Sequence, residues 1–260
     1  MKDTSDNTLT VLGSSSGMPQ ANRACSGYVL QTGESLSLID CGGGVCSSFL
    51  RCGFDPFKLD RIFVSHTHSD HVCDLSLIIQ MLHVLRTGRR LDVYLPGEFI
   101  APFRSYLNAV YLLSDNIKLE LRIHGYSDGL VYENDRFKLT AIGNSHLVGT
   151  KVDIGRLGLP NRMQCCSFRI DVGDRSVFYS ADIGSFEDIR DQLQDLDYAL
   201  VETTHVNLEH LFDHMRSSTV GEYILTHLGD EEEVAALRNQ IERASLTNVS
   251  LANDGLRLEL

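Results

Sequence analysis

The chain has 260 residues, of which 43% are hydrophobic and 22% are charged, and its formal net charge is −12. This composition is typical of a globular protein that can bury a core, and no apolar run approaches the roughly 18 residues that a membrane span needs. The surplus of negative charge weighs against duplex DNA or long RNA as the main partner, because a polyanion is repelled by a surface of like charge.

Two features of the chain favour a cytoplasmic protein that does not contact a membrane. Residues 1–8 are polar and lack the apolar core of a signal peptide. The seven cysteines are odd in number and include the adjacent Cys165 and Cys166. This pattern predicts reduced thiols and not a disulfide framework.

The amino-terminal half alternates strands with helices. Apolar alternation and β-branched residues predict strands at 9–13, 27–32, 36–40, 61–65 and 91–96. A glycine-rich turn, CGGG, leads into a short helix that Gly53 closes. Apolar residues at helical spacing predict further helices at 74–86 and 97–112.

The carboxyl-terminal half repeats this alternation. Strands are predicted at 137–143, 166–172, 176–182, 198–203, 222–227 and 256–260. Helices are predicted at 185–191 and 231–243, the second with a capping box formed by Asp230 and Glu233. Residues 147–164 are predicted to form a loop.

The order of these elements predicts an α/β (α+β) protein with two sheets packed together and helices outside. No linker or low-complexity stretch interrupts the chain, so we expect one domain over 1–260. A short internal echo supports two related halves, because IFVSHTHSDH and YILTHLGDEE both place Ser or Thr and then His after an apolar strand. Halves of this kind would bring metal ligands to a common edge.

The segment SHTHSDH, residues 65–71, is the strongest chemical signal in the sequence. Side chains two residues apart in an extended segment point the same way, so His66 and His68 can bind one ion. Asp70 and His71 follow where the chain turns toward the helix at 74–86, and that turn can direct both at a second ion. Imidazole and carboxylate ligands suit zinc, and iron and manganese accept similar ligands.

Three more candidate ligands follow later strands. Read alone, His146 and His227 are as easily satisfied loop histidines as ligands, and Asp182 could cap the helix predicted at 185–191. Their placement after predicted strands is compatible with a shared metal site. The sequence pattern by itself leaves both interpretations open.

SHTHSDH resembles the signature loop of the metallo-β-lactamase superfamily, whose four-layer αββα sandwich holds one or two metal ions. LGSSSGMPQANRACSGYVL followed by LIDCGGG resembles the opening of its ribonuclease Z-like branch, and NSH, YSADIG and ILTH fall where later ligands of the family belong. The resemblance implies a first metal position with His66, His68 and His146 and a second with Asp70, His71 and His227. It also implies that Asp182 bridges the two positions.

The same resemblance implies a hydrolase with two divalent ions, zinc in the first place and manganese or iron as alternatives, that activate a water as the nucleophile. Asp70 would be catalytic as well as a ligand, since it would orient that water. Asp40 resembles the aspartate beneath the family's metal loop and is predicted to hydrogen-bond a ligand or the loop backbone.

A proton donor for the leaving group is the last catalytic part that the resemblance implies. Family spacing favours His205, after the predicted strand at 198–203, with Glu202 as its support. The alternative is His214, which lies with His210 at i, i+4 on a short predicted helix and is otherwise an exposed surface residue.

The chain departs from the ribonuclease Z pattern between the third histidine and the bridging aspartate. Only 36 residues separate His146 from Asp182, and they leave no room for the arm that grips tRNA. We therefore expect a small phosphodiester or cyclic nucleotide as substrate and do not expect long nucleic acid to be the main partner. Arg156 and Arg162 of the loop are either phosphate contacts or solvated side chains.

Other functions compatible with the sequence are a ribonuclease Z-like endonuclease acting on RNA and a hydrolase of a lactone, thioester or sulfate ester. A homodimer is compatible with both functions. In the case of the RNA endonuclease, the partner subunit would supply the contacts to RNA that the missing arm makes in ribonuclease Z. A non-hydrolytic binding module is disfavoured by the complete ligand set. A redox role is disfavoured by His68, where flavo-diiron relatives have glutamate.

Overall fold

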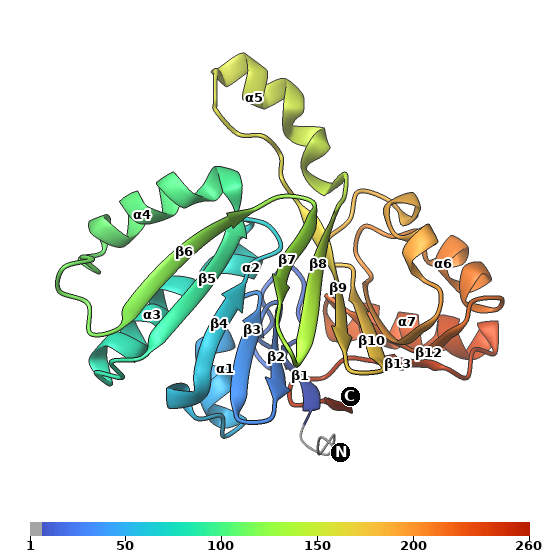
Figure 1. The fold of residues 1–260 in the computed structure, drawn as a ribbon. Helices are drawn as coiled ribbons and strands as arrows, with labels where there is room; N and C mark the ends of the chain where they lie inside the picture. Colours follow the sequence, from blue (N-terminus) through green and yellow to red (C-terminus); the bar gives the residue numbers. More distant parts are fainter. Residues whose placement is uncertain (1–6) are drawn as a thin grey trace. The chain divides into compact units, whose positions relative to one another are not determined.

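The computed structural model describes residues 7–260, so that most of the amino-terminal segment 1–8 lies outside the described residues. The chain divides into two compact units, one that runs up to Tyr126 and includes Asn253–Leu260, and another over Ser127–Ala252. Each unit is built around its own sheet (Figure 1).

The first unit contains a seven-stranded mixed sheet in the order β14-β1-β2-β3-β4-β5-β6. Its strands are β1 (Asn7–Gly13), β2 (Gly27–Thr32), β3 (Ser35–Ile39), β4 (Leu59–Phe63), β5 (Arg90–Pro96), β6 (Glu120–Tyr126) and β14 (Arg257–Glu259). Its helices are α1 (Val45–Arg51), α2 (Ser69–Val72), α3 (Leu75–Val84) and α4 (Ile100–Ala109), with short 3-10 turns at Pro56–Lys58 and Gly97–Phe99. Strands β3 to β6 are parallel, so their carboxyl ends meet at one edge.

The core of the first unit lies between one face of the sheet and helices α1, α3 and α4. Apolar residues recur on the inner face of each helix, as Phe49 in α1, Ile78 in α3 and Phe103 in α4 show, and they pack with strand residues such as Ile62 and Val93. This packing places the carboxyl ends of β3 and β4 beside the amino-terminal turns of α1 and α2.

The second unit contains a seven-stranded mixed sheet in the order β13-β12-β11-β10-β9-β8-β7. Its strands are β7 (Gly129–Glu133), β8 (Phe137–Gly143), β9 (Cys166–Val172), β10 (Arg175–Tyr179), β11 (Leu196–Glu202), β12 (Val220–Thr226) and β13 (Val249–Leu251). Its helices are α5 (Lys151–Leu157), α6 (Leu208–Met215) and α7 (Glu231–Ala244), with 3-10 turns at His146–Thr150, Phe186–Asp188 and Arg190–Gln192. Strands β10 to β13 are parallel, and α6, α7 and the turns after β10 pack on one face of the sheet.

Most of the predicted elements are confirmed with ends shifted by one or two residues. The capping box of α7 is present, because the carboxylate of Asp230 accepts hydrogen bonds from the backbone N–H groups of Glu232 and Glu233, and Glu233 accepts one from Asp230. All seven cysteines are free, as predicted from their number and spacing. No helix within residues 7–260 is long and apolar enough to cross a membrane.

Three predictions were wrong in detail. Residues 147–164, predicted as a loop, contain α5, which has no buried residue and stands out beyond the ends of β8 and β9 in Figure 1. The helix predicted at 185–191 is instead a pair of 3-10 turns, because Ser185 and Asp188 close a capping box after a single turn. Strands β6, β7 and β13 were missed.

Candidate functional site

In the first unit, the segment predicted to bind metal follows β4 directly. His66 and His68 lie in the loop with ring centroids 4.9 Å apart, and a nitrogen of each ring lies within 4.8 Å of one on the other. Asp70 and His71 lie in the first turn of α2, where the Asp70 Oδ2 and His71 Nε2 atoms are 3.4 Å apart. The loop therefore gathers three imidazoles and a carboxylate over six residues, His66 to His71.

Burial differs among these four side chains. His66 and His71 are fully buried, Asp70 is partly exposed and His68 is exposed. The ring centroids of His66 and His71 are 4.1 Å apart. The loop thus holds its two innermost rings within the fold and presents His68 to solvent.

Asp40 supports the loop from beneath, as predicted. It follows β3 with a left-handed backbone (φ 58°), and it is fully buried. Its Oδ2 accepts a hydrogen bond from His71 Nδ1 at 2.8 Å, and its Oδ1 accepts one from the backbone N–H of Ser65 at 2.7 Å. The carboxylate therefore contacts both a candidate ligand and the loop backbone.

The glycine-rich turn after Asp40 also fixes the loop. The Cys41 N–H donates to the carbonyl oxygen of His71 at 2.7 Å, and the Asp74 N–H donates to the carbonyl oxygen of Cys41 at 2.9 Å. A Cβ added at Gly42 would lie 1.9 Å from the carbonyl oxygen of Asp70. Glycine is thus required at this position for the turn to approach the metal loop.

In the second unit, three further candidate ligands lie at the ends of strands. His146 follows β8, Asp182 follows β10 and His227 follows β12 with a left-handed backbone (φ 56°). The two oxygens of Asp182 face different rings, with Oδ2 3.6 Å from His146 Nε2 and Oδ1 3.3 Å from His227 Nε2. Asp182 is 2% exposed, and the helix-cap alternative is excluded because Ser185 is the N-cap of the turn that follows.

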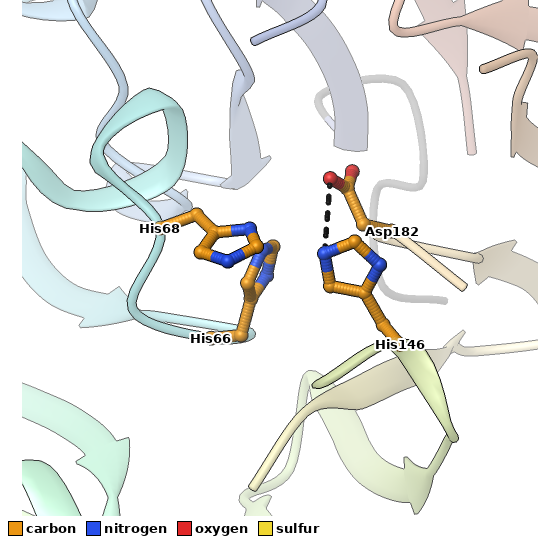
Figure 2. Close-up of side chains that lie close together, drawn as sticks. All are labelled: His66, His68, His146 and Asp182. Atoms are coloured by element: carbon orange, nitrogen blue, oxygen red, sulfur yellow. Dashed lines mark ion pairs between the residues drawn. The ribbon is translucent and has the colours of Figure 1, made fainter. Parts of the chain in front are cut away.

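Figure 2 shows His66 and His68 side by side on the loop after β4, and the ring of His146 facing the Asp182 carboxylate along the dashed ion pair. The donors in each unit are imidazole nitrogens and carboxylate oxygens. This donor set fits zinc and also suits manganese or iron, whereas thiolates are absent from the candidate clusters found within residues 7–260.

His205 lies beside the ligands of the second unit. Its ring centroid is 4.8 Å from that of His146 and 6.0 Å from that of His227. Its Nδ1 is 3.0 Å from Oε1 of the buried Glu202, whose other oxygen accepts a hydrogen bond from the His205 backbone N–H at 2.9 Å. The predicted support by Glu202 is therefore present in the structure.

His214 has a different environment. Its Nε2 is 3.2 Å from the carbonyl oxygen of Leu193, and its ring lies edge-on to Phe186 at a centroid distance of 5.5 Å. His210, one turn earlier on α6, is exposed. His214 thus helps to pack α6 against the rest of its unit. It does not form an exposed surface pair with His210.

The two arginines of the 147–164 segment, Arg156 and Arg162, lie on the surface. Arg156 forms an ion pair with Asp153 at 2.8 Å on the solvent side of α5, and Arg162 is exposed. The apolar side chains of Val152 and Leu157 are also exposed.

Three residues close to the candidate ligands were missed at the level of sequence. The Ser65 hydroxyl donates to Asp40 Oδ2 at 2.8 Å and lies 3.1 Å from His66 Nδ1. The Thr204 hydroxyl lies 3.0 Å from His227 Nδ1. The Tyr126 hydroxyl donates to the carbonyl oxygen of Val64 and lies 3.2 Å from that of Ser65. Only Ser65 carried a signal, since a hydroxyl residue before the first histidine forms part of the internal echo.

Comparisons with known proteins identify the family and the fold of this chain. The model of the family described as Anti-Pycsar protein Apyc1 matches residues 7–248. A ribonuclease Z from Picosynechococcus sp. is 32% identical over 54% of this chain and 44% of that protein. The chain thus spans less than half of the length of that ribonuclease Z relative.

A second relative matches along nearly its whole length. The probable metallo-hydrolase YhfI from Bacillus subtilis is 26% identical over 95% of this chain and 97% of that protein. The crystal structure of YhfI, described as a metallo-β-lactamase fold protein, has a TM-score of 0.77 at 24% identity and covers 98% of this chain and 99% of that one.

A third similar structure is that of a diphosphatase from the PhnP family, with a TM-score of 0.70 at 18% identity and coverage of 98% of both chains. At these identities the structural matches establish the fold alone. The α/β metallo-β-lactamase fold predicted from the sequence is confirmed.

Proposed function

Because this chain belongs to the family described as Anti-Pycsar protein Apyc1 and has a metallo-β-lactamase fold, we propose that it is a metal-dependent hydrolase of a small phosphodiester or cyclic nucleotide. The observation that carries this proposal is the Asp182 carboxylate, whose two oxygens face the Nε2 atoms of two different histidines. Such an arrangement suits a carboxylate that bridges two divalent ions.

We assign seven ligands to two metal positions. His66, His68 and His146 would hold the first ion, Asp70, His71 and His227 would hold the second, and Asp182 would contact both. Seven N and O donors exceed the four of a single tetrahedral zinc, which supports two ions. When bound, two such ions would activate a water and neutralise charge on the attacked phosphoryl group, and zinc is the first choice, with manganese or iron as alternatives.

The remaining steps belong to side chains of this chain. Asp70 would orient the attacking water in addition to its role as a ligand. Glu202 Oε1 accepts from His205 Nδ1, so that the other ring nitrogen, Nε2, would carry the proton for the leaving group. That proton would pass to the departing oxygen as the ester bond breaks.

A small substrate is favoured over folded RNA by two observations. The formal charge of −12 opposes the binding of a long polyanion. The segment between His146 and Asp182 carries only the two-turn helix α5, which exposes Val152 and Leu157 and pairs Arg156 with Asp153. Because some relatives are ribonucleases Z, an RNA endonuclease is the second candidate function.

A substrate panel tests the proposal. Bis(p-nitrophenyl) phosphate, cyclic nucleotides with each of the four common bases, a lactone, a thioester, a sulfate ester and a precursor tRNA are incubated with protein and zinc or manganese. We expect kcat/KM to be highest for a small phosphodiester. Precursor tRNA should be cut poorly, and its weak binding should weaken further as salt rises.

A double variant, His66→Ala with His68→Ala, is the control for metal-dependent cleavage in that panel. Position-specific cleavage at the 3′ end of the tRNA would reverse the order of the two candidate functions, and it would point to a grip supplied by a second subunit. A preference for the lactone, thioester or sulfate ester would contradict the assignment to phosphodiesters. A cytoplasmic location stays a prediction that this panel does not address.

A further inference from the structure

We propose that two hydroxyl groups, those of Ser65 and Thr204, are positioning residues that hold the Nδ1 atoms of His66 and His227 and so reserve Nε2 of each ring for metal. Ser65 also links His66 to Asp40, the carboxylate that holds His71 directly. The inference rests on the proposed function where it treats these histidines as metal ligands. It concerns how two hydroxyl groups orient the ligands, a role that the sequence analysis did not assign to them.

The chemistry of the groups settles the direction of each hydrogen bond around Asp40. An ionised carboxylate only accepts, so the Ser65 hydroxyl donates its single hydrogen to Asp40 Oδ2 at 2.8 Å. The same hydroxyl oxygen, 3.1 Å from His66 Nδ1, must then accept a hydrogen from that nitrogen. His71 Nδ1, 2.8 Å from Asp40 Oδ2, donates for the same reason.

These bonds determine the protonation pattern of both rings. A neutral imidazole carries one hydrogen, so a ring that donates through Nδ1 has its lone pair at Nε2. Asp40, Ser65, His66 and His71 are all 0% exposed, and water does not compete for these contacts. One buried carboxylate therefore orients a candidate ligand of each metal position, His71 directly and His66 through a hydroxyl.

The second unit uses a hydroxyl in the same way. The Thr204 hydroxyl donates to the carbonyl oxygen of His227 at 3.2 Å and lies 3.0 Å from His227 Nδ1. We assign the single hydrogen of this hydroxyl to the carbonyl, which can only accept, so that the hydroxyl oxygen accepts from Nδ1. Nε2 of His227, which lies 3.3 Å from Asp182 Oδ1, is then the atom left for metal.

Thr204 is itself held by the acid that supports His205. Its backbone N–H and that of His205 both donate to Glu202 Oε2. Glu202 therefore orders the turn that carries both the hydroxyl on a metal ligand and the histidine assigned to the leaving group. In both units a buried acid therefore helps to orient a histidine. Asp40 acts through the Ser65 hydroxyl, and Glu202 acts through the turn that carries Thr204.

Nitrogen NMR of the histidine rings in the metal-free protein tests whether the two hydroxyls fix the protonated ring nitrogen. This test depends on neither metal binding nor activity. The ¹⁵N shifts of neutral rings distinguish Nδ1–H from Nε2–H forms, and His66, His71 and His227 should all be in the Nδ1–H form. In Ser65→Ala, His66 alone should lose this fixed form. In Thr204→Val, which removes a hydroxyl at nearly constant shape, His227 alone should lose it, and Thr204→Ser should restore it.

Metal retention is the second readout. Chelator competition should show a 10–100-fold loss of affinity at one metal position in Ser65→Ala and at the other in Thr204→Val, because partners of ligating histidines typically contribute this much. Asp40→Asn should weaken both positions. Cadmium-113 NMR, with one signal for each position, identifies which is affected.

Ser48→Ala is the matched control, since Ser48 is also buried and its hydroxyl donates to the carbonyl oxygen of Leu12 at 2.6 Å, away from the ligands. It should leave metal affinity unchanged. Wild-type affinity at both positions in Ser65→Ala and Thr204→Val, with each variant folded by its unfolding temperature, would overturn the proposal. So would Nε2–H forms of His66 and His227 in the wild type.

The failure of the proposed function would look different. A protein that binds two ions through correctly oriented rings but cleaves no ester would refute the hydrolase and leave the positioning role intact. A wild-type protein that takes up no metal would refute both the hydrolase and the metal role of the two hydroxyls.

Discussion

Individual residues at strand ends carry the candidate chemistry of this protein. Asp40, Ala181 and His227 each follow a strand and each has a left-handed backbone, with φ values of 58°, 49° and 56°. Non-glycine residues seldom adopt this conformation, which costs about 1–3 kcal/mol each and persists where the surroundings enforce it. At these three positions the chain bends at, or next to, a candidate ligand or the aspartate that supports one.

His205 is predicted to act on the leaving group and not to bind metal. We expect His205→Ala to lower turnover by roughly 10²–10⁴, because the departing oxygen then lacks a proton donor. Metal content should stay unchanged. Turnover of a small phosphodiester and elemental analysis of the same sample are the measurements.

His214→Ala is the paired control for that prediction. His214 contacts the Leu193 carbonyl and the Phe186 ring, so its loss should lower stability more than turnover. A large loss of turnover in His214→Ala, together with near wild-type turnover in His205→Ala, would reverse the assignment of the proton donor.

The sequence revealed the metal-ligand candidates and the acids Asp40 and Glu202 that support the site, but not the supporting hydroxyls. His66, His68, Asp70 and His71 lie in one short motif, and ligands at later strand ends follow from the family pattern. A supporting hydroxyl such as Thr204 contacts a ring 23 residues away in the chain. Ser and Thr are common in turns, so no local pattern distinguishes this one.

At the level of elements, the metal loop depends on the turn between β3 and α1. A Cβ at Gly42 would meet the backbone of Asp70 at 1.9 Å, and a backbone atom cannot move aside as a flexible side chain can. We expect Gly42→Ala to lower the free energy of unfolding by about 1–3 kcal/mol and to displace the loop that carries the ligands. Denaturant unfolding and metal retention are the measurements.

Gly155→Ala provides the comparison, because a Cβ at Gly155 meets nothing within 4 Å and the residue lies inside α5. It should raise stability by about 0.5–1 kcal/mol and leave metal binding unchanged. Equal stability and equal metal retention in Gly42→Ala and the wild type would show that the close approach of this turn is not needed.

The elements that sequence patterns missed are those with little buried surface. Strand β6 at one edge of its sheet has exposed and half-buried residues and only one buried residue, Tyr126; β7 at an edge of the other sheet has no buried residue, and β13 has only three residues. Helix α5 buries none of its seven residues. Only a few apolar residues of β6 and β13 pack against a core, Leu121 and Ile123 in one and Val249 and Leu251 in the other, and α5 packs none, so the apolar pattern in these segments is short.

At the scale of the whole molecule, the two units share one plan of strand pairing. Read from β14 or from β7, each sheet has three antiparallel pairings followed by three parallel ones. The plan matches β4 with β11, whereas the echo noted in the sequence had matched β4 with β12. His205, after β11, thus occupies the position in its unit that the metal loop occupies in the other.

Ester hydrolysis by this protein is proposed to depend on metal ions that the candidate ligand histidines, among them His66 and His68, hold. The most direct test measures metal content and hydrolysis of a small phosphodiester together, while zinc or manganese is added back to chelator-treated protein. We predict that the rate rises from background and saturates at about two ions per chain, and that the His66→Ala, His68→Ala double variant does not recover. Full activity in metal-free protein, or equal metal content in the wild type and the double variant, would contradict the account.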